Sequence, residues 1–322
     1  MAKQSPSDKH HKSIDNTGFS PNSSAEGARL TNKDGRINLR KSGVPFYERI
    51  SVYHSLLRMN QMVFTLTVFG IYTCLNLLFA AIYYLIGIQN LAGTHPVNRF
   101  LEDFLQAFFF SSQTLTTVGY GHISPVGFVT NLIASLESFM GIMSFALVTG
   151  MFYARFSRPQ AYIRFSSYFL IAPFKGGRGL MFRLATYKNN YLTDANAQVT
   201  IAIHVEEGGK TVTKFFPLSL EIDRINSLAL SWTIVHPLDE KSPLYEYSKQ
   251  DFIDCKIELM ITIKAFDDHF SNTVQQRTSY TQDEMIYGAR YLPMYARSED
   301  GTYTNLMLEK LDLHEKAQLP SN

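Results

Sequence analysis

Six consecutive residues near the middle of the chain, Thr116-Thr117-Val118-Gly119-Tyr120-Gly121, have the residue types needed to bind a bare cation. A cation sheds its water only if other oxygens replace the hydration shell, and the backbone carbonyls here, with the Thr117 hydroxyl, could supply a stack of them. Carbonyls that point the same way in succession need alternating left- and right-handed backbone, which glycine tolerates and other residues resist. The sequence therefore predicts an ion-binding stretch at Thr117, Val118, Gly119, Tyr120 and Gly121.

The pentapeptide Thr-Val-Gly-Tyr-Gly is the known sequence of the potassium selectivity filter, in which four such loops surround one axis. Potassium is therefore assigned as the bound ion because the sequence matches this known case. The only metal ion expected is K⁺, bound at the filter carbonyls. The alternative is a Gly-Tyr-Gly turn in an ordinary loop. The setting argues against it, because the stretch lies between two apolar segments of membrane length.

Those two segments define the membrane part of the chain. Residues 59–98 contain no Asp, Glu, Lys or Arg, and 62–88 exceed the roughly 20 apolar residues that span a bilayer. Residues 124–154 carry a single charge, Glu137. A buried helix pair in a soluble protein is the alternative, but apolar runs of this length are rare there. The sequence predicts two spans, at about 62–88 and about 124–156.

The distribution of charge predicts the orientation. Basic residues precede the first span and follow the second, whereas the segment between them has only Arg99, beside Glu102 and Asp103. By the positive-inside rule both termini are cytoplasmic, in a multi-pass protein of the cell (inner) membrane. The chain is 322 residues long and near neutral, with 18% charged residues, so bulk charge suggests no nucleic-acid partner. The polar residues 1–35 read as a disordered tail.

A surface helix is expected just before the first span. In residues 45–57, Phe46, Ile50, Tyr53 and Leu57 share one face, which is typical of an amphipathic helix on the inner membrane surface. An ordinary linker helix is the alternative. Basic residues flank this helix and the exit of the second span, where anionic lipid head groups would be attracted. The candidate lipid-binding residues are Lys41, Arg49 and Arg158, although such charges could also serve only to set topology.

A short helix should lead into the filter. Asn98 could cap a Phe-rich helix over about 98–114, whose C-terminal dipole would favour a cation. Irregular backbone at membrane depth must be enclosed by protein. One copy cannot enclose it, so several chains must surround a common axis.

The second span carries a helical stripe that could line a pore: Ser138, Ile142, Phe145, Thr149 and Tyr153. Gly141 and Gly150 are candidate hinges. The alternative is that this stripe packs on the first helix. Glu137 is an ionisable group at membrane depth and hence a functional candidate, supporting the filter through a hydrogen bond to the pore helix. Alternatively, its charge reaches the outer interface.

The second half of the chain changes to a strand pattern. Residues 181–185, 198–205 and 257–263 are strand-like, Gly208-Gly209 reads as a hairpin turn, and helical signals return only at 306–317. We expect an all-β sandwich over about 160–305. The domains expected are a tail (1–35), a segment with the surface helix (36–58), a pore domain (59–157), a β-sandwich domain (158–312) and a second tail (313–322).

The second half also carries a family resemblance. The runs Ser231-Trp232-Thr233-Ile234-Val235-His236-Pro237-Leu238-Asp239, Ser242-Pro243-Leu244-Tyr245, Ser248-Lys249-Gln250-Asp251 and Asp283-Glu284-Met285-Ile286-Tyr287-Gly288 resemble the inward-rectifier potassium channel family. The segment Tyr153-Ala154-Arg155-Phe156-Ser157-Arg158-Pro159 is similar to its bacterial branch. The resemblance implies a homotetramer with a slide helix, two spans, a pore helix and an immunoglobulin-like cytosolic β-sandwich. It also implies an aromatic gate at Tyr153 and regulation by anionic phospholipids.

Several positions depart from the strongly rectifying members of that family. Phe145 stands where an acidic residue binds polyamines, Gln113 replaces an acidic residue behind the filter, and Lys264 replaces a vestibule carboxylate. Asp194 matches one remaining vestibule carboxylate, and the outer-loop cysteine pair is absent. We therefore expect weak rectification.

The chain also lacks the short motifs of nucleotide, zinc and serine-hydrolase sites, so no enzyme activity and no cofactor beyond the permeant ion is expected. The competing function is a membrane-anchored β-sandwich that binds or senses a ligand without conducting ions.

Overall fold

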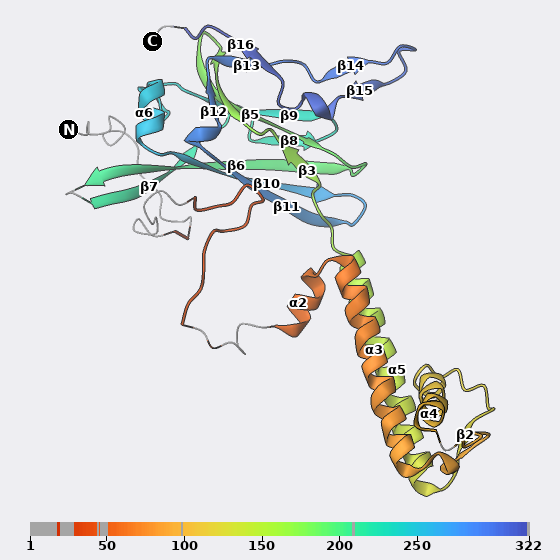
Figure 1. The fold of residues 1–322 in the computed structure, drawn as a ribbon. Coiled ribbons are helices and arrows are strands. Elements are labelled where there is room, and N and C mark those ends of the chain that lie inside the picture. The colour runs from red at the N-terminus through yellow and green to blue at the C-terminus, as the bar shows by residue number, and fades with distance from the viewer. Residues whose placement is uncertain are drawn as a thin grey trace. The chain divides into compact units, whose positions relative to one another are not determined.

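The computed structural model describes residues 18–19, 29–43, 45, 51–97, 99–207 and 210–320. The chain forms two compact units (Figure 1). The membrane unit comprises Ser42–Arg158, and the β unit comprises Met1–Lys41 with Pro159–Asn322.

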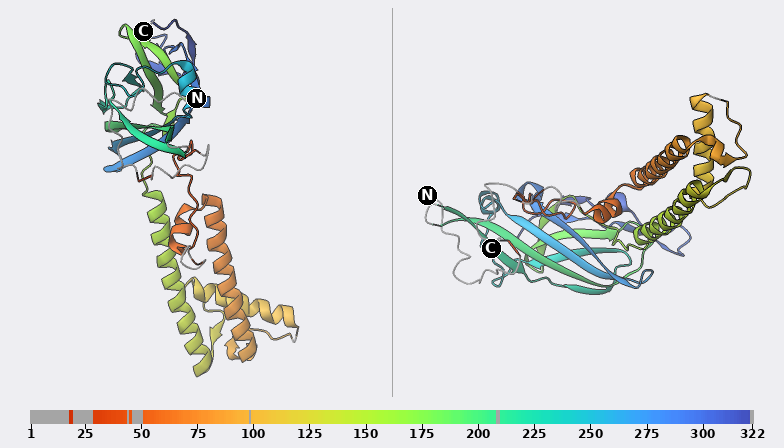
Figure 2. Two further views of the ribbon diagram at one scale, coloured as in Figure 1. Left: turned by 90° about the vertical axis from the view of Figure 1, so that its left-hand side faces the viewer. Right: turned by 90° about the horizontal axis from the view of Figure 1, so that it is seen from below.

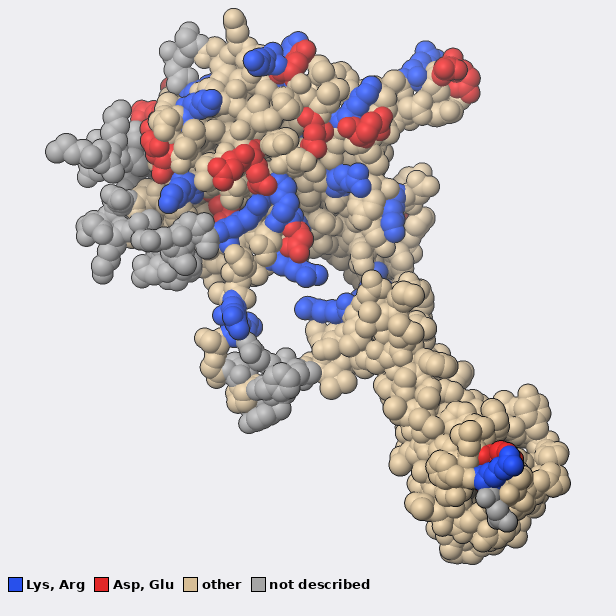
Figure 3. Space-filling view, viewed as in Figure 1, with Lys and Arg blue, Asp and Glu red and all other residues tan. Residues whose placement is uncertain are grey.

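Helices dominate the membrane unit. Its elements in chain order are α2 (Val52–Arg58), α3 (Gln61–Ile86), the 3₁₀ turn η2 (Ile88–Asn90), β1 (Leu91–Ala92), α4 (Phe100–Leu115), β2 (Ser124–Pro125) and α5 (Phe128–Phe156). With 26 residues at a rise of 1.5 Å, α3 is about 39 Å long, which exceeds the hydrocarbon thickness of a bilayer. Both α3 and α5 are long and apolar enough to cross a membrane, as predicted. Charged side chains are correspondingly sparse on the visible face of this unit (Figure 3).

The ends of these helices have local causes. The Asn60 side chain accepts from the Met62 amide at 3.0 Å and starts α3, and Gly87, with φ +111°, ends it. The second span begins at Phe128, later than predicted, because Ser124 and Pro125 pair with Ala92 and Leu91 as a short sheet. The pore helix is α4, whereas the predicted cap Asn98 lies outside the described residues.

Within the membrane unit, α3 and α5 lie side by side and α4 packs against both (Figure 2). Their shared core includes Phe79, Tyr83, Ala107, Phe110 and Ala134. Only the last part of the expected surface helix is described, as α2, in which Leu57 is buried and Tyr53 is 56% exposed. Residues 46–50 lie outside the described residues.

The β unit consists almost entirely of strands. Its elements are β3 (Ile163–Phe165), β4 (Phe169–Phe174), β5 (Gly177–Thr186), β6 (Leu192–Glu207), β7 (Lys210–Leu218), β8 (Arg224–Ser227), β9 (Ser231–Pro237), α6 (Lys249–Asp254), β10 (Glu258–Asp267), β11 (Asn272–Thr281), the 3₁₀ turn η3 (Gln282–Glu284), β12 (Met285–Tyr287), β13 (Ala289–Tyr291), β14 (Tyr295–Arg297), β15 (Thr304–Leu306), the 3₁₀ turn η4 (Leu308–Lys310) and β16 (His314–Lys316). All three predicted strand runs are confirmed, in β5, β6 and β10.

Two five-stranded sheets make up most of this unit. One has the order β11-β10-β6-β7, with β8 also paired to β6; the other has the order β12-β4-β5-β3, with β9 also paired to β5. Residues of both sheets share one core, for example Phe182 and Ile234 from the second sheet with Ile201 and Ile261 from the first. The predicted all-β sandwich is confirmed. The antiparallel β6–β7 pair also agrees with the expected hairpin, although Gly208 and Gly209 lie outside the described residues.

Two predictions about the ends of this unit are wrong. Residues 306–317 are not helical: β15, η4 and β16 occupy them, because Leu306, Leu308 and Leu311 pack with Ala185 and Met294 instead of forming a helical face. Residues 313–322 are not simply a tail either, since His314–Lys316 pair with β13.

Residues 29–35 belong to the folded β unit and not to a disordered tail. Glu258 of β10 accepts from the amides of Leu30 at 2.7 Å and Thr31 at 2.8 Å. The Lys33 ammonium lies 3.0 Å from the Glu284 carboxylate and 3.9 Å from the centre of the Tyr280 ring. These partners are more than 220 residues away along the chain, so the local polar composition gave no sign of them.

Candidate functional site: an ion filter between two spans

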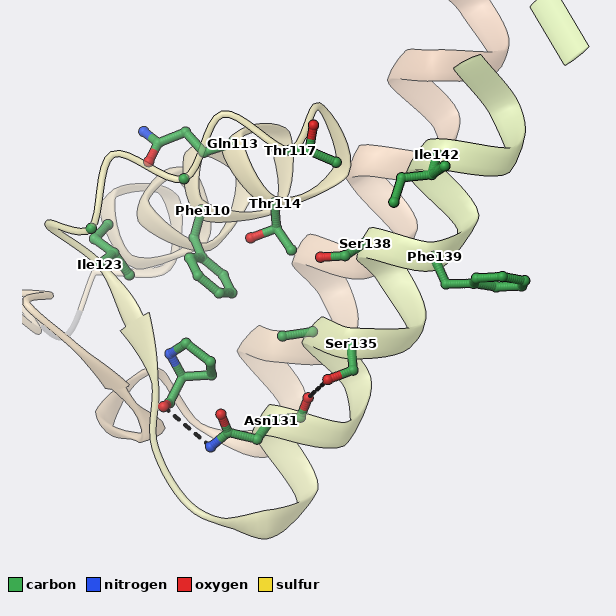
Figure 4. A pocket seen from close by; sticks show the side chains of 14 residues that line it. Phe110, Gln113, Thr114, Thr117, Ile123, Asn131, Ser135, Ser138, Phe139 and Ile142 are labelled. Carbon is green, nitrogen blue, oxygen red and sulfur yellow. Dashed lines mark hydrogen bonds between the residues drawn. The ribbon is translucent and has the colours of Figure 1, made fainter. Parts of the chain in front are cut away.

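The filter is held by the C-terminal end of α4. After this helix the chain folds back, so that the amides of Val118 and Gly119 donate to the Gln113 carbonyl at 3.0 and 3.2 Å, and the Thr117 amide donates to Thr114 at 3.0 Å. Gln113 therefore contacts the filter through its backbone. Its side chain points away from α5 (Figure 4).

The backbone of the filter alternates in handedness. Thr117, Gly119 and Gly121 have φ of +60°, +50° and +80°, whereas the intervening Val118 and Tyr120 are not in the left-handed region. This is the conformation that was expected at the two glycines. Thr117 adds a β-branched residue in the same region, which is sterically unfavourable and marks a local constraint that the sequence did not indicate.

A groove runs between the filter and α5. Thr114 and Thr117 on one side and Ser138 and Ile142 on the other line part of it (Figure 4). Further down α5, Phe145 and Tyr153 are each 75% exposed and Thr149 is exposed. These three side chains of the predicted stripe are therefore largely exposed in the single chain, and their role in lining a pore stays a prediction.

The two glycines of α5 have different surroundings. A Cβ added at Gly141 would lie 2.0 Å from the Leu115 carbonyl oxygen, whereas one at Gly150 would meet no described atom within 4 Å. Gly141 therefore permits α5 to approach the end of α4. The helix continues through both positions, and their role as hinges stays a prediction.

Glu137 is completely buried behind the pore helix. Its carboxyl oxygens lie 2.7 Å from the Tyr83 hydroxyl of α3 and 2.5 Å from the Ser111 hydroxyl of α4. Asn76, also fully buried, lies 3.2 Å from Ser111. The alternative that Glu137 reaches the outer interface is thus wrong, and the expected hydrogen bond to the pore helix is present. Sequence reasoning missed Tyr83, Ser111 and Asn76, which look like ordinary residues of apolar helices.

Arg155 is a second residue whose role the sequence did not reveal. Its guanidinium donates to the carbonyls of Leu56 and Met59 at the end of α2, and it stacks 4.4 Å from the centre of the Phe64 ring. It thereby connects the surface helix to the end of α5. In the sequence it was only one of several basic residues that set topology.

The remaining candidate residues are distributed over both units. Arg158 is exposed in the membrane unit, Lys41 is exposed in the β unit, and Arg49 lies outside the described residues. In the β unit, Asp194 of β6 forms an ion pair with Arg224 of β8. The vestibule carboxylate suggested by the sequence thus has a cationic partner in its own chain. Lys264 of β10 is exposed.

The two halves of the chain match family models that agree with this geometry. The membrane part, residues 61–158, matches a model described as "Ion channel", and residues 163–321 match one described as "Inward rectifier potassium channel C-terminal domain". The inward rectifier potassium channel Kirbac3.1 of Paramagnetospirillum magnetotacticum is 31% identical over 90% of this chain and 96% of its own length. This chain belongs to the inward rectifier potassium channel family.

More distant inward rectifiers are similar over most of the chain as well. The G protein-activated inward rectifier potassium channel 3 of Mus musculus is 28% identical over 95% of this chain and 83% of its own. The inward rectifier potassium channel irk-1 of Caenorhabditis elegans is 23% identical over 86% and 55%, respectively. The inward rectifier fold of a membrane pore unit followed by an all-β domain therefore applies to this chain.

The motifs typical of inward rectifiers in the β unit are structural. Trp232 is buried, and His236 bridges the Ser219 carbonyl at 2.6 Å and the Ser242 hydroxyl at 2.8 Å. The buried Arg178 donates to the carbonyls of Tyr245 and Tyr247. These motifs hold the loop after β9 in place. Among the residues that the structure describes, no cluster of His, Cys, Asp and Glu is arranged to hold a metal ion.

Proposed function

We propose that this protein is a potassium-selective channel that conducts K⁺ passively through a homotetrameric pore. The observation that carries the proposal is the alternating handedness of Thr117, Gly119 and Gly121, directly after a short helix between two spans. Such a backbone turns successive carbonyls toward one line and can replace the water of a potassium ion. A membrane-anchored sensor would have no use for this conformation.

The exposure of the filter supports assembly. Val118 is 54% and Tyr120 79% exposed in the single chain, although the filter lies at membrane depth between two spans. Irregular backbone at that depth has to be surrounded by protein. Four copies around one axis provide both the enclosure and the ring of carbonyls.

Flux measurements on purified protein in liposomes test this function. We expect wild type to pass K⁺ or Rb⁺ and to exclude Na⁺, and we expect Gly119→Ala to lose conduction because L-alanine resists φ +50°. A matched control is Gly176→Ala, a left-handed glycine of the β unit at φ +81° with no described atom within 4 Å of the added Cβ. Equal flux of sodium and potassium through wild type would refute the proposal.

We further infer that the pore closes at its cytoplasmic end, where the exposed Tyr153 continues the stripe of Phe145 and Thr149. Four converging aromatic rings would form a hydrophobic constriction that closes by dewetting. Rectification should be weak, because the stripe has Phe145 in place of an acid and Asp194 is paired with Arg224. This proposal includes cytoplasmic termini on the basis of the positive-inside rule.

Anionic lipids are the proposed modulators. Arg158 is exposed at the end of α5, and each basic residue near an anionic leaflet is attracted by about 1 kcal/mol. We expect flux to differ between neutral liposomes and liposomes doped with anionic lipid, and we expect Arg158→Gln to reduce that difference. Arg99→Gln, in the segment between the spans, is the control. An identical lipid response of wild type and Arg158→Gln would leave Arg158 as a topology signal only.

A further inference from the structure

The buried cluster of Tyr83, Asn76, Ser111 and Glu137 contains more acceptors than its hydroxyl protons can serve if Glu137 is ionised. The Ser111 oxygen faces three acceptor atoms: Oε1 of Glu137 at 2.5 Å, Oδ1 of Asn76 at 3.2 Å and the Asn76 carbonyl at 3.3 Å. A serine hydroxyl has one proton to donate. If Glu137 is ionised, Ser111 donates its proton to the carboxylate. The Asn76 Oδ1 atom then faces a lone pair of the Ser111 oxygen and has no hydrogen bond from it.

The orientation of the Asn76 amide is fixed by another contact. Its Nδ2 donates to the Tyr72 carbonyl at 2.8 Å, so that Oδ1 is the atom facing Ser111. On the other side of Glu137, the Tyr83 hydroxyl donates to Oε2 at 2.7 Å. Rotation of the amide therefore cannot resolve the surplus of acceptors without breaking the bond to Tyr72.

One additional proton satisfies every contact between the four side chains. If Oε1 of Glu137 carries it, the carboxyl donates to Ser111, Ser111 donates to Asn76, and Oε2 still accepts from Tyr83. Each hydroxyl proton then has one acceptor, and none of the four buried side chains is left with an unpaired oxygen.

The surroundings also favour the neutral acid. Glu137, Asn76 and Ser111 are 0% exposed and Tyr83 is 1% exposed. On the packed elements, α3 carries no charged residue, and α4 carries only Glu102 and Asp103, which contact Arg99 and the Val97 amide. On α5 the other charge is Arg155, which contacts Leu56 and Met59. No cation among the described residues offsets a charge on Glu137, and an isolated buried carboxylate is strongly disfavoured.

We propose that Glu137 is a protonated carboxylic acid that acts as a hydrogen-bond donor and so fixes the pore helix α4 between α3 and α5 behind the filter. This inference deepens the proposed function, because Ser111 lies two residues before Gln113, whose carbonyl holds the filter amides. Glu137 is a positioning residue here, since it reaches the filter only through α4. Removal of its proton would turn a donor toward Ser111 into a second acceptor and loosen this end of α4.

Infrared spectroscopy of the full-length protein in liposomes tests the proton directly, with ¹³C-labelled glutamate to identify the band. We expect wild type at neutral pH to show a carboxylic-acid carbonyl band that Glu137→Gln lacks and that Glu102→Gln retains. Ser111→Ala removes the acceptor of the Glu137 proton and should shift the frequency of this band. This variant identifies the band if Glu137→Gln fails to assemble. Absence of the band from wild type would overturn the proposal.

Function provides the second readout. Glutamine can donate to Ser111 and accept from Tyr83, so Glu137→Gln should keep flux and K⁺ selectivity, whereas Glu137→Ala should lower flux by about tenfold or more. Wild-type flux should fall on the alkaline side, and that fall should be absent in Glu137→Gln. If wild-type flux instead falls at acid pH, and Glu137→Gln removes that fall, Glu137 is not protonated at neutral pH and the proposal is contradicted. The infrared band does not require conduction, so failure of the channel function and failure of this proposal are distinguishable.

Discussion

The two units of this chain bury their apolar side chains to very different extents. The β unit encloses a core from both of its sheets, with Phe169, Phe182 and Tyr280 at most 1% exposed. The membrane unit has large apolar side chains at its surface, including Phe128 at 83%, Phe139 at 63% and Phe145 at 75%. One unit completes its core within a single chain, whereas the other leaves large apolar side chains exposed, which lipid and further copies would cover in the proposed tetramer.

This difference separates two kinds of residue that look alike in a sequence. An aromatic residue in the β unit stabilises the fold of its own chain, whereas one on α5 is available for a pore or for contacts between chains. Mutations in the first class should therefore change the free energy of unfolding. Mutations in the second class should change assembly and flux while the chain remains folded.

The largest effect is expected where the membrane unit is closely packed. In Gly141→Ala the new methyl group would lie 2.0 Å from the Leu115 carbonyl, so the end of α4 and its filter must move. We expect conduction in liposomes to be lost. Gly70→Ala in α3 is the control, because its methyl group also meets no described atom within 4 Å and Gly70 is not a candidate hinge. Wild-type flux in Gly141→Ala would show that the close approach of Gly141 to Leu115 is unimportant.

A cavity in the β unit should affect stability and leave selectivity alone. Phe182 is 1% exposed between the two sheets, so Phe182→Ala should lower the free energy of unfolding by about 3–5 kcal/mol. Denaturant unfolding of the full chain measures this, with Phe270→Ala, at 46% exposure, as the control. The ratio of Rb⁺ to Na⁺ flux in the assembled fraction should be unchanged, and a change would link this core to the filter.

Tyr153 should show the opposite behaviour. Its side chain is 75% exposed, so Tyr153→Ala removes little packing within the chain. If four such rings form the closed constriction, the variant should raise basal Rb⁺ flux by roughly several-fold. The reason is that a wider and less apolar constriction stays hydrated and no longer blocks the ion. Unchanged flux in a well-folded tetramer would move the constriction to Phe145.

The smallest effect concerns residues 29–35, which dock on the β unit through Glu284. Burial alone would raise the pKa of Glu284, but the Thr281 amide and the Lys33 and Arg29 cations outweigh it and lower the pKa below the ordinary value. The stabilisation is therefore present above the ordinary glutamate range and is lost as pH falls through the lowered pKa.

We accordingly expect Glu284→Gln to reduce hydrogen-exchange protection of residues 29–35 at pH 7 by about 1 kcal/mol or less. The two proteins should converge in acid. Glu315→Gln, which breaks the exposed pair with Arg290, is the control. A difference between wild type and Glu284→Gln that grows in acid would contradict the assigned direction.

Local patterns were sufficient for the spans, the pore helix, the filter conformation and three main strands. Apolar length identifies a span, and glycine spacing identifies a left-handed backbone, because both depend on neighbouring residues only. The docking of Leu30 and Thr31 on Glu258 could not be foreseen, since the contact joins distant parts of the chain. The helix expected over 306–317 was wrong for the same reason: tertiary packing on Met294 determines that segment.

The candidate site shows the same limit. Glu137 was recognisable as a lone charge in an apolar run, but its partners Tyr83, Ser111 and Asn76 carry no local signal. The sequence suggested Gly141 as a hinge, whereas the structure shows that only a small residue fits against the Leu115 carbonyl. Arg155 was indistinguishable from neighbouring basic residues until its contacts with Leu56 and Met59 were known.

The ion pair of Asp194 and Arg224 has a consequence for the vestibule that the family resemblance implies. In the proposed tetramer, a ring of unpaired carboxylates would concentrate cations within a Debye length, about 8 Å at physiological ionic strength. Because a guanidinium lies beside each carboxylate, the negative charge is largely neutralised and this local excess of cations is largely lost. The arrival of potassium at the cytoplasmic mouth should then follow its bulk concentration, and the unitary current should depend little on added inert salt.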